Sequence, residues 1–359
     1  MLDFTSALYL GFRHGTRDLR PWTQFTTGRP AALGSPQLAS EVARQLAALQ
    51  GCERAMVATS TLHVFWDLFP VIAGRRAAIF LDGGTYPIAR WGVERAAALG
   101  IPVWTFPHHC ARSLRQAFAS ARSDRSPVIV ADGFCPACGR CAPVAEYLAL
   151  ARQYGGYLIL DDTQALGIFG HSASPEAPYG KGGGGVLRKT NLGGSGVVLV
   201  SSLAKAFGAP IAVLSGPADL VERYESESET RMHCSPPSVA ALSAAEHALQ
   251  LNRQRGDSLR QHLVALVRHF QSLLEATGLT HTSGVFPVQT ILGSGADSTA
   301  VYDRLLRTGV RAVLHQAHNQ TGPQLSFLIT ARHTLAQLER IVDLLARAVG
   351  LVSPQLIWR

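Results

Sequence analysis

The chain has 359 residues, of which 47% are hydrophobic and 16% are charged. This composition excludes a disordered chain and is typical of a well-packed soluble protein with one large domain and a smaller one. The net charge of +8 is spread along the chain without a basic run, so we expect no nucleic-acid partner. No apolar run reaches the roughly 18 residues of a membrane span, and the N-terminus lacks the basic start of a secretory signal. We therefore expect a cytoplasmic protein without a membrane partner.

Short apolar runs alternate with helical stretches in the first two thirds of the chain. The spacing of apolar residues predicts helices over 36–50, 89–100 and 144–155. Apolar runs predict buried strands over 55–59, 77–81, 103–106, 128–131, 157–161, 197–201 and 211–215. Strands that are buried on both faces are continuously apolar, as these are. The alternation therefore predicts an α/β fold with a mainly parallel sheet.

The pattern changes near residue 236. Two long helices are predicted over 238–251 and 260–277, followed by strands over 285–292 and 325–330 and a last helix over 334–349. The glycine-rich segment 179–196 is predicted to be a loop. We expect an N-terminal arm over 1–35, a large α/β domain over 36–236 and a small α+β domain over 237–359.

One lysine stands out, because only three of the 33 basic residues are lysines. Lys205 lies in SSLAKAFGAP, among small residues between two predicted strands. A partly buried lysine can lose its proton near neutral pH, whereas an arginine cannot. Lys205 is therefore a candidate nucleophile or base. The alternative is a lysine at a strand end whose charged head stays in water.

A carboxylate and a hydroxyl-rich turn are predicted to lie near this lysine. Asp161 ends the strand of YLILDD, and ligands gather at the carboxyl ends of parallel strands. An amine and a carboxylate together suit pyridoxal phosphate, because the amine bonds to the coenzyme and the carboxylate keeps the ring nitrogen protonated. In VATSTLHVFWDLF, the hydroxyl residues 59–61 precede a helical pattern, which suits a phosphate or simply a helix cap.

The blocks over 130–170 and 201–210, in this order and spacing, carry a family resemblance. The chain resembles the fold-type-I pyridoxal-phosphate-dependent enzymes, and within them the α-oxoamine synthases, the group that includes 8-amino-7-oxononanoate synthase. The resemblance implies a mixed, mainly parallel sheet in a large domain and a smaller α+β C-terminal domain. It also implies a homodimeric transferase that condenses an amino acid with an acyl thioester, acyl-CoA or acyl carrier protein, with loss of carbon dioxide.

The resemblance assigns roles residue by residue. Lys205 matches the lysine that bonds to the coenzyme, and Asp161 matches the partner of the ring nitrogen. His108, in FPHHC, matches the histidine that stacks on the ring. Tyr86 and Gln164 stand where the family has two further histidines. The residues that match the phosphate-binding positions are Ser60, Thr61, Leu62 and Ser202.

The chain departs from the family near its C-terminus. In GPQLSFLITARHT, Gln324 and Ser326 stand where the family has arginines, the first of which clamps the substrate carboxylate. The clamp is lost unless Arg29 or Arg332 replaces it. Two alternatives therefore stay open. One is another pyridoxal-phosphate reaction on an amine, such as amino transfer or retro-aldol cleavage, and the other is a non-catalytic protein with the same fold.

Three of the six cysteines form the segment CPACGRC over 135–141. Its CxxC spacing is that of zinc sites, and His108, His109 and Cys110 could supply further ligands. The matching family segment is a loop without metal near the coenzyme, so we expect no metal. The three cysteines are then plain thiols in a turn. Two alternatives stay open: they bind zinc, or they have a redox or substrate-contacting role.

Overall fold

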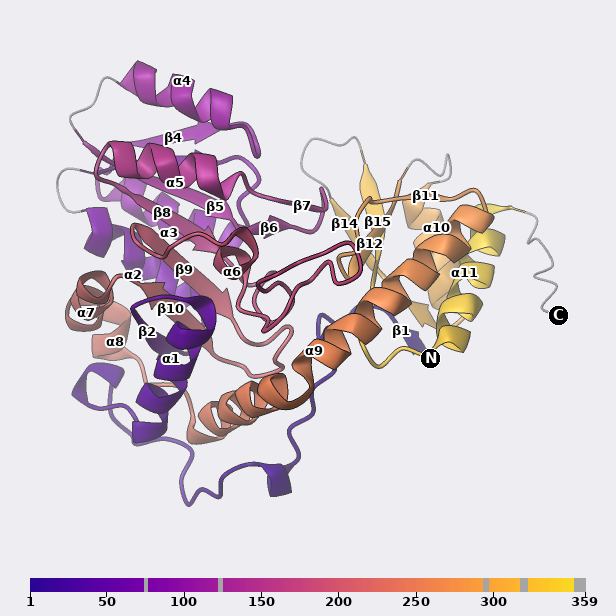
Figure 1. Ribbon diagram of the computed structural model, residues 1–359, viewed down its shortest axis with the longest axis horizontal. Helices are drawn as coiled ribbons and strands as arrows, with labels where there is room; N and C mark the ends of the chain where they lie inside the picture. The colour runs from indigo at the N-terminus through magenta and orange to yellow at the C-terminus, as the bar shows by residue number, and fades with distance from the viewer. Residues whose placement is uncertain (74–76, 122–124, 293–296, 317–321, 352–359) are drawn as a thin grey trace.

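The larger lobe is built around a seven-stranded sheet. The computed structural model describes residues 1–73, 77–121, 125–292, 297–316 and 322–351 (Figure 1). The strand order is β2-β10-β9-β8-β5-β3-β4, and β10 alone among these seven runs antiparallel to its neighbours. All seven predicted strands are confirmed. Their bounds are β2 (Arg54–Ala58), β3 (Ala77–Asp82), β4 (Val103–Phe106), β5 (Ser126–Asp132), β8 (Tyr157–Asp161), β9 (Val197–Ser202) and β10 (Ala212–Gly216).

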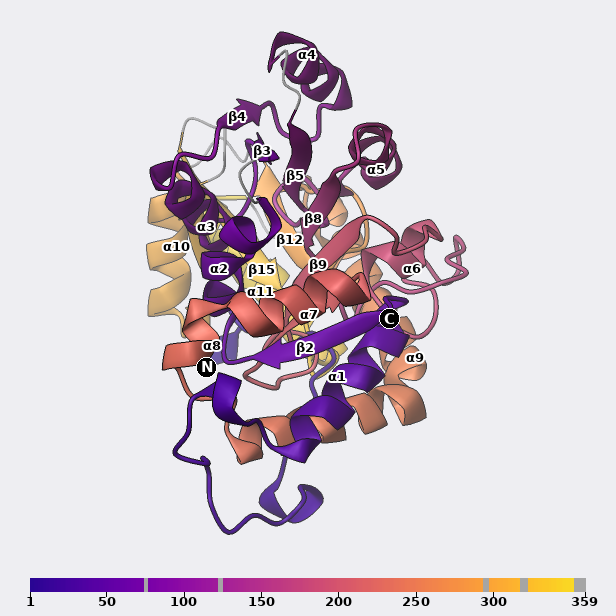
Figure 2. The ribbon, with the colours of Figure 1, turned by 90° about the vertical axis from the view of Figure 1, so that its left-hand side faces the viewer.

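Helices cover both faces of this sheet, which explains why its strands are apolar throughout. Alternate side chains of β5, such as Ile129 and Val130, enter two different hydrophobic clusters. One face packs against α1 (Gln37–Gln50), α4 (Ala111–Ala121), α5 (Val144–Gln153) and α6 (Val186–Thr190). The other face packs against α2 (Thr61–Ala73), α3 (Pro87–Ala98) and α7 (Ala218–Glu227), the last followed by α8 (Glu229–His233). Figure 2 shows α1 and α7 on opposite sides of β2.

The smaller lobe contains a four-stranded antiparallel sheet of order β11-β12-β15-β14. The first strand of the chain also lies here, because β1 pairs with β13 in parallel. The bounds are β1 (Leu2–Asp3), β11 (Thr280–His281), β12 (Val288–Leu292), α10 (Ser298–Arg307), β13 (Val310–Arg311), β14 (Val313–Gln316), β15 (Pro323–Leu328) and α11 (Leu335–Val349). None of the helices among the described residues has the length and hydrophobicity needed to span a bilayer.

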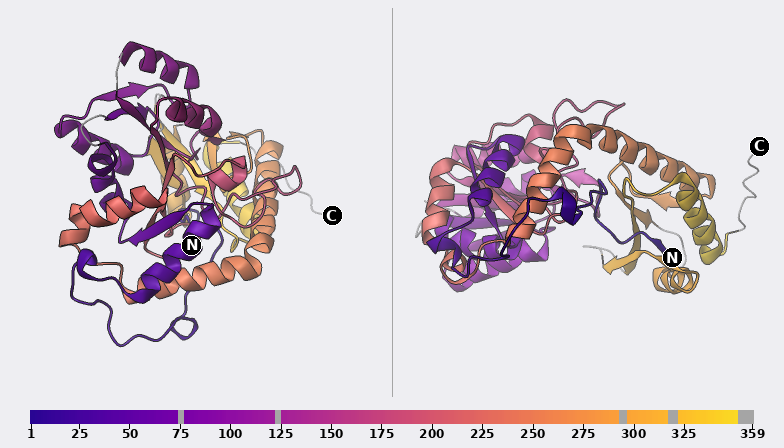
Figure 3. Two further views of the ribbon diagram at one scale, coloured as in Figure 1. Left: turned by 60° about the vertical axis from the view of Figure 1, so that its left-hand side comes forward. Right: turned by 90° about the horizontal axis from the view of Figure 1, so that it is seen from below.

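A single helix, α9 (Val239–Ala276), connects the two lobes, and the prediction of two separate helices here was wrong (Figure 3, right). The predicted break fell on NRQRGDSL, over 252–259, which lacks apolar periodicity. Two of these polar residues contact the glycine-rich segment 179–196. Asn252 Nδ2 donates to the carbonyl of Gly182 (2.8 Å), and Oδ1 of Asp257 accepts a hydrogen bond from the N–H of Gly182 (2.8 Å). Just beyond the expected break, buried Arg260 donates to the carbonyl of Gly167 (2.8 Å). The helix continues through this stretch because its buried polar side chain, Asn252, finds a partner within the protein and the others face solvent.

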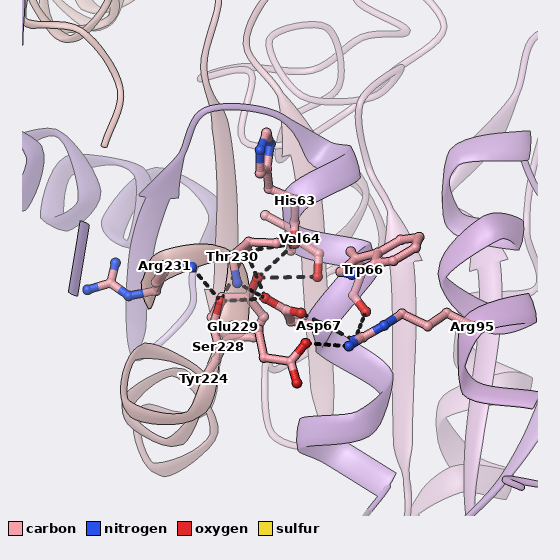
Figure 4. A network of polar contacts seen from close by, with 10 residues as sticks. All are labelled: His63, Val64, Trp66, Asp67, Arg95, Tyr224, Ser228, Glu229, Thr230 and Arg231. Carbon is pink, nitrogen blue, oxygen red and sulfur yellow. Dashed lines mark hydrogen bonds and ion pairs between the residues drawn. The ribbon is translucent and has the colours of Figure 1, made fainter. Parts of the chain in front are cut away.

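A network of polar contacts around Asp67 anchors α2 (Figure 4). Asp67 is 2% exposed, and its Oδ2 accepts hydrogen bonds from the hydroxyls of Ser228 and Thr230, each at 2.7 Å. Its Oδ1 lies 3.3 Å from Nη1 of Arg95 in α3. Asp67 therefore ties α2 to α3 and to the start of α8. The network bears on the site described below, because the first residue of α2 borders the main cavity.

We expect Asp67→Ala to lower the free energy of unfolding by about 3 kcal/mol, because it leaves buried donors without an acceptor. Urea unfolding followed by far-UV circular dichroism measures this change. The matched control is Glu229→Ala, which removes the other carboxylate on Arg95. Glu229 is 62% exposed, so its loss should cost below about 1 kcal/mol. Equal losses of unfolding free energy in the two variants would contradict the anchoring role of Asp67.

Candidate active site

The carboxyl ends of neighbouring parallel strands form the floor of the main cavity. Asp132 ends β5 and Asp161 ends β8, and the sheet register places these two residues side by side. Ser202 ends β9, the next strand along. The cavity has a volume of about 810 Å³ and is lined by side chains from both lobes. Six of the predicted site residues line it: Thr61, Tyr86, Asp161, Gln164, Ser202 and Lys205.

Lys205 lies in the connection between β9 and β10, lines this cavity and is half-buried. Burial lowers the pKa of its amine, because desolvation disfavours the charged form, and the carboxylates of Asp161 and Asp132 partly offset the effect. Its Nζ lies 5.9 Å from the centroid of the Tyr86 ring. A lysine with a lowered pKa has a larger neutral fraction near pH 7, which is the form that attacks a carbonyl group.

The paired aspartates differ in how they are held. Asp161 is 8% exposed, and its Oδ1 accepts a hydrogen bond from the backbone N–H of Thr163 (3.0 Å). Asp132 accepts one from the N–H of Tyr86 (3.1 Å). Burial raises the pKa of both carboxyl groups, and for Asp132 the neighbouring Asp161 raises it further. A negative charge on these neighbouring carboxyl groups is stabilised by a nearby cation, and a protonated ring nitrogen would supply one.

Two of the four predicted phosphate-binding residues line the cavity. Thr61 begins α2, where backbone N–H groups favour an anion, and Ser202 lines the same cavity. Ser60 and Leu62 are not among the lining residues. The Ser60 hydroxyl instead lies 2.7 Å from Nδ1 of His63. The roles of Ser60 and Leu62 therefore stay predictions.

The two candidate ring-stacking residues lie in different places. The side chain of Tyr86 lines the cavity and is 55% exposed. His108 is not among the lining residues; its ring packs over the backbone of Gly84, where a Cβ atom would come within 2.1 Å of its Nδ1. Because Gly84 itself lines the cavity, the imidazole of His108 lies behind the cavity wall. The aromatic side chain that lines the cavity is thus Tyr86, whereas the family resemblance implied that His108 stacks on the coenzyme ring.

Gln164 is held by the N-terminal segment. Its Oε1 accepts a hydrogen bond from the hydroxyl of Tyr9 (2.8 Å), and Tyr9 is fully buried. This bond fixes which end of the amide is the acceptor, so the nitrogen remains to donate a hydrogen bond. The residues before α1 therefore complete the site, since Ala7 and Tyr9 both line the cavity. Sequence reasoning gave Tyr9 no role because nothing local links it to Gln164.

The wall from the smaller lobe carries neutral polar groups. The hydroxyl of Ser326 lies 2.6 Å from that of Thr290 and 2.8 Å from Nε2 of His315. Burial lowers the pKa of His315, so the imidazole is mainly neutral near pH 7. We call Thr290, Ser326 and His315 the neutral triad. One of its members, Ser326, stands where the family resemblance implies an arginine.

None of the three predicted carboxylate-binding residues lines the cavity. Gln324 lies on the same strand as Ser326 and is 7% exposed, outside the lining. Arg332 donates to the carbonyls of Gly11 and Phe12, each at 2.8 Å, and Arg29 is exposed on the N-terminal arm. Among the described residues the lining contains no arginine. The prediction that Arg29 or Arg332 binds the substrate carboxylate in place of the family's arginine stays a prediction, and no contact supports it.

Besides Tyr9, sequence reasoning missed Asp132 and two members of the neutral triad, Thr290 and His315. Asp132 had a visible signal, because the run VIVAD ends in an acid just as YLILD does. Thr290 and His315 had none, since they meet Ser326 only through the antiparallel pairing of β12 and β14 with β15.

The residues present fit pyridoxal phosphate: a buried amine, a buried carboxyl pair, an aromatic face and a helix N-terminus surround one cavity. Fold and site together define a pyridoxal-phosphate-dependent transferase of fold type I. Residues 27–345 match the family described as aminotransferase class I and II. The chain belongs to this family.

Relatives and solved structures agree with this assignment. The 8-amino-7-oxononanoate synthase of Alkalilimnicola ehrlichii is 28% identical over 357 residues, which cover 95% of this chain and 86% of the relative. A serine palmitoyltransferase of S. paucimobilis with bound pyridoxal phosphate and myriocin superposes with a TM-score of 0.84 at 18% identity, covering 98% and 88% of the two chains. The 8-amino-7-oxononanoate synthase of Francisella tularensis superposes with a TM-score of 0.73 at 17% identity, covering 98% of each chain. The predicted fold, cofactor and enzyme class are confirmed.

Proposed function

We propose that the protein condenses an amino acid with an acyl thioester and releases carbon dioxide. The observation that carries the proposal is the meeting of Lys205 and Asp161 in one cavity at the strand ends. The name shared by the similar relatives, 8-amino-7-oxononanoate synthase, supports the reaction class. Acyl-CoA and acyl carrier protein are the two forms of thioester that we propose as donors. The net charge of +8 favours either, because both carry phosphate.

The side chains divide the work between them. When bound, pyridoxal phosphate supplies an aldehyde for amines and a ring that accepts electrons released at the substrate α-carbon. Lys205 would hold the coenzyme through its amine, and its Nζ would carry a proton to or from the substrate α-carbon. Asp161 would favour the protonated form of the ring nitrogen. Tyr86 would offer an aromatic face to the ring, and the first turn of α2 with Ser202 would hold the phosphate.

We propose that the whole enzyme is a homodimer. Large apolar side chains lie exposed on α2 and α3, which pack against each other: Leu62 and Trp66 on the first, Trp91 on the second. The guanidinium of Arg95 lies 5.0 Å from the ring centroid of Trp66 and joins the two helices on this side. A surface of this kind next to the cavity suits contact with a second copy of the chain.

The neutral triad favours a second candidate function. A carboxylate is bound best by a guanidinium, and the triad offers only neutral hydrogen bonds. The substrate could therefore be an amine without an α-carboxylate, processed by amino transfer or carbon–carbon cleavage. The first candidate requires that hydroxyl and imidazole donors suffice for the carboxylate.

Matched pairs of substrates separate the two candidates. Glycine and methylamine, L-alanine and ethylamine, and L-serine and ethanolamine differ only by the carboxylate. We expect an amino acid of such a pair to change the visible absorption of the coenzyme-loaded protein saturably. Acyl-CoA should then yield free thiol and carbon dioxide in equal amounts. If only the amines change the visible absorption, or if an added keto acid is consumed, the condensation reaction is contradicted and the second candidate function is favoured.

Ser326→Arg tests the wall directly. A guanidinium there should lower the amino-acid concentration at half-saturation by about tenfold, since charge-assisted hydrogen bonds are the stronger ones. The matched amine should gain nothing. Ser326→Ala is the control, because it alters the same position without adding a cation. If Ser326→Arg affects the acid and the amine equally, the triad does not face the carboxylate position.

A further inference from the structure

A hairpin at the edge of the cavity brings two cysteines together. β6 (Phe134–Cys135) and β7 (Arg140–Cys141) pair antiparallel around the turn 136–139. Gly139 has a φ of +69° and donates its N–H to the carbonyl of Cys135 (2.9 Å), which closes the turn. The turn places Cys135 and Cys138 on the same side, and Sγ of Cys138 approaches the carbonyl of Cys135 at 3.8 Å. This is the geometry through which CxxC turns chelate metals.

Two histidines that follow β4 face these thiols. Sγ of Cys138 lies 3.5 Å from Nε2 of His108 and 3.9 Å from Nδ1 of His109. Ligand atoms of His108, Cys135 and Cys138 all lie within 4.8 Å of one another. In a tetrahedral zinc site the sulfur and nitrogen ligands are about 3.6 Å apart, given their usual bond lengths to zinc. The distances from Sγ of Cys138 to the two imidazole nitrogens, 3.5 and 3.9 Å, are close to that value.

The surroundings of His108 are those of a metal ligand. Its Nδ1 lies 2.7 Å from Oδ1 of Asp82, a carboxylate that is 1% exposed. Asp82 is itself fixed, since its oxygens accept hydrogen bonds from the N–H groups of Gly84 (2.8 Å) and His109 (2.9 Å) and from the hydroxyl of Tyr147 (3.1 Å). A histidine held by a carboxylate at one nitrogen presents the other nitrogen in a fixed direction, as metal-binding histidines do.

His109 adds a second sign that these side chains are arranged for a ligand. Its φ of +55° is a left-handed conformation that is costly outside glycine. Its Nε2 is buried and has no hydrogen-bond partner among the described residues. A buried ring nitrogen without a partner is destabilising unless something else compensates. This ring thus has a buried nitrogen without a partner at Nε2, while its other nitrogen, Nδ1, already lies toward Sγ of Cys138.

We propose that Cys135, Cys138 and His108, with His109 as the fourth ligand, bind a structural zinc ion. Two thiolates and two imidazoles are a ligand set that zinc prefers, and four protein ligands leave no open position for catalysis. Binding releases the thiol protons to solvent. The ion would tie the hairpin, whose residues 135–137 line the cavity, to the turn 107–110 and the end of β3. This inference does not depend on the reaction that the enzyme catalyses.

The metal content of the intact protein tests the site. After expression with added zinc and exhaustive dialysis, we expect inductively coupled plasma mass spectrometry to find about one zinc ion per chain. Replacement of zinc by cobalt(II) should give tetrahedral visible bands and a thiolate-to-cobalt charge-transfer band. Both measurements use the unmodified chain, so they do not depend on whether a variant folds.

Substitutions then identify the ligands. Cys135→Ser and Cys138→Ser should each lose most of the zinc. Cys141→Ser is the matched control, because Cys141 belongs to the same hairpin but not to the ligand cluster, and it should keep the metal. Far-UV circular dichroism confirms that each variant is folded. Metal-free protein with six titratable thiols, a disulfide between Cys135 and Cys138, or equal zinc loss in all three variants would overturn the proposal.

Discussion

Lys205→Ala should remove the visible absorption that borohydride can bleach and lower the turnover of product by on the order of 10³-fold. The substitution deletes both the amine that bonds to the coenzyme and the acid–base group for the substrate α-carbon. Burial makes Lys205 suited to both roles, because it lowers the pKa of the amine. Absorption spectra of the protein, before and after borohydride, and product formation measure the two effects separately.

The other two lysines are the controls. Lys181 is exposed, whereas Lys189 is partly buried, with its Nζ 3.6 Å from the centroid of the Phe169 ring. Lys181→Ala and Lys189→Ala should keep the absorption. Peptide mapping after borohydride should find the reduced coenzyme on the peptide that contains Lys205. A modified peptide carrying Lys189 instead would remove the basis of the proposed site.

Asp161→Asn should lower kcat by about 10²-fold, because an amide no longer favours the protonated form of the ring nitrogen. The phosphate and the covalent lysine remain, so the coenzyme should still bind, with an altered absorption maximum. KM for the amino acid should change little, since Asp161 lies at the strand ends that form the floor of the cavity and not on the wall of the neutral triad. Steady-state kinetics on coenzyme-saturated protein separate these quantities.

Asp132→Asn is the matched control for this prediction. Asp132 ends the neighbouring strand in register with Asp161, so the two substitutions make the same chemical change on adjacent strands. Burial and the nearby Asp161 raise the pKa of Asp132 well above its ordinary value, and Asp132 is not the residue that matches the family's partner of the ring nitrogen. We expect a loss of kcat below about tenfold. A larger loss in Asp132→Asn than in Asp161→Asn would exchange their roles.

The sequence was most informative where function depends on residues close together in the chain. The apolar runs predicted all seven strands of the larger sheet, because strands buried on both faces need no alternation. Lys205 and Asp161 follow such strands directly, so parallel pairing alone brings them to one edge of the sheet.

Prediction was weakest where contacts join distant segments. His108 matched a family position, but its hydrogen bond to Asp82 and its packing on Gly84 depend on how the turn 107–110 folds back. Gln324 stands at the position that was expected to bind the substrate carboxylate, yet its neighbour Ser326 lines the cavity and Gln324 does not. The break expected in α9 failed for a similar reason, since its buried polar side chain, Asn252, is satisfied by a segment about 70 positions away.

The unbroken length of α9 has a mechanical consequence. A 38-residue helix is about 57 Å long, and it packs first against α1 of the larger lobe and then against α11 of the smaller one. Such a rod does not act as a hinge. We therefore expect the cavity to open and close by local rearrangement of side chains and turns rather than by a hinge in this helix.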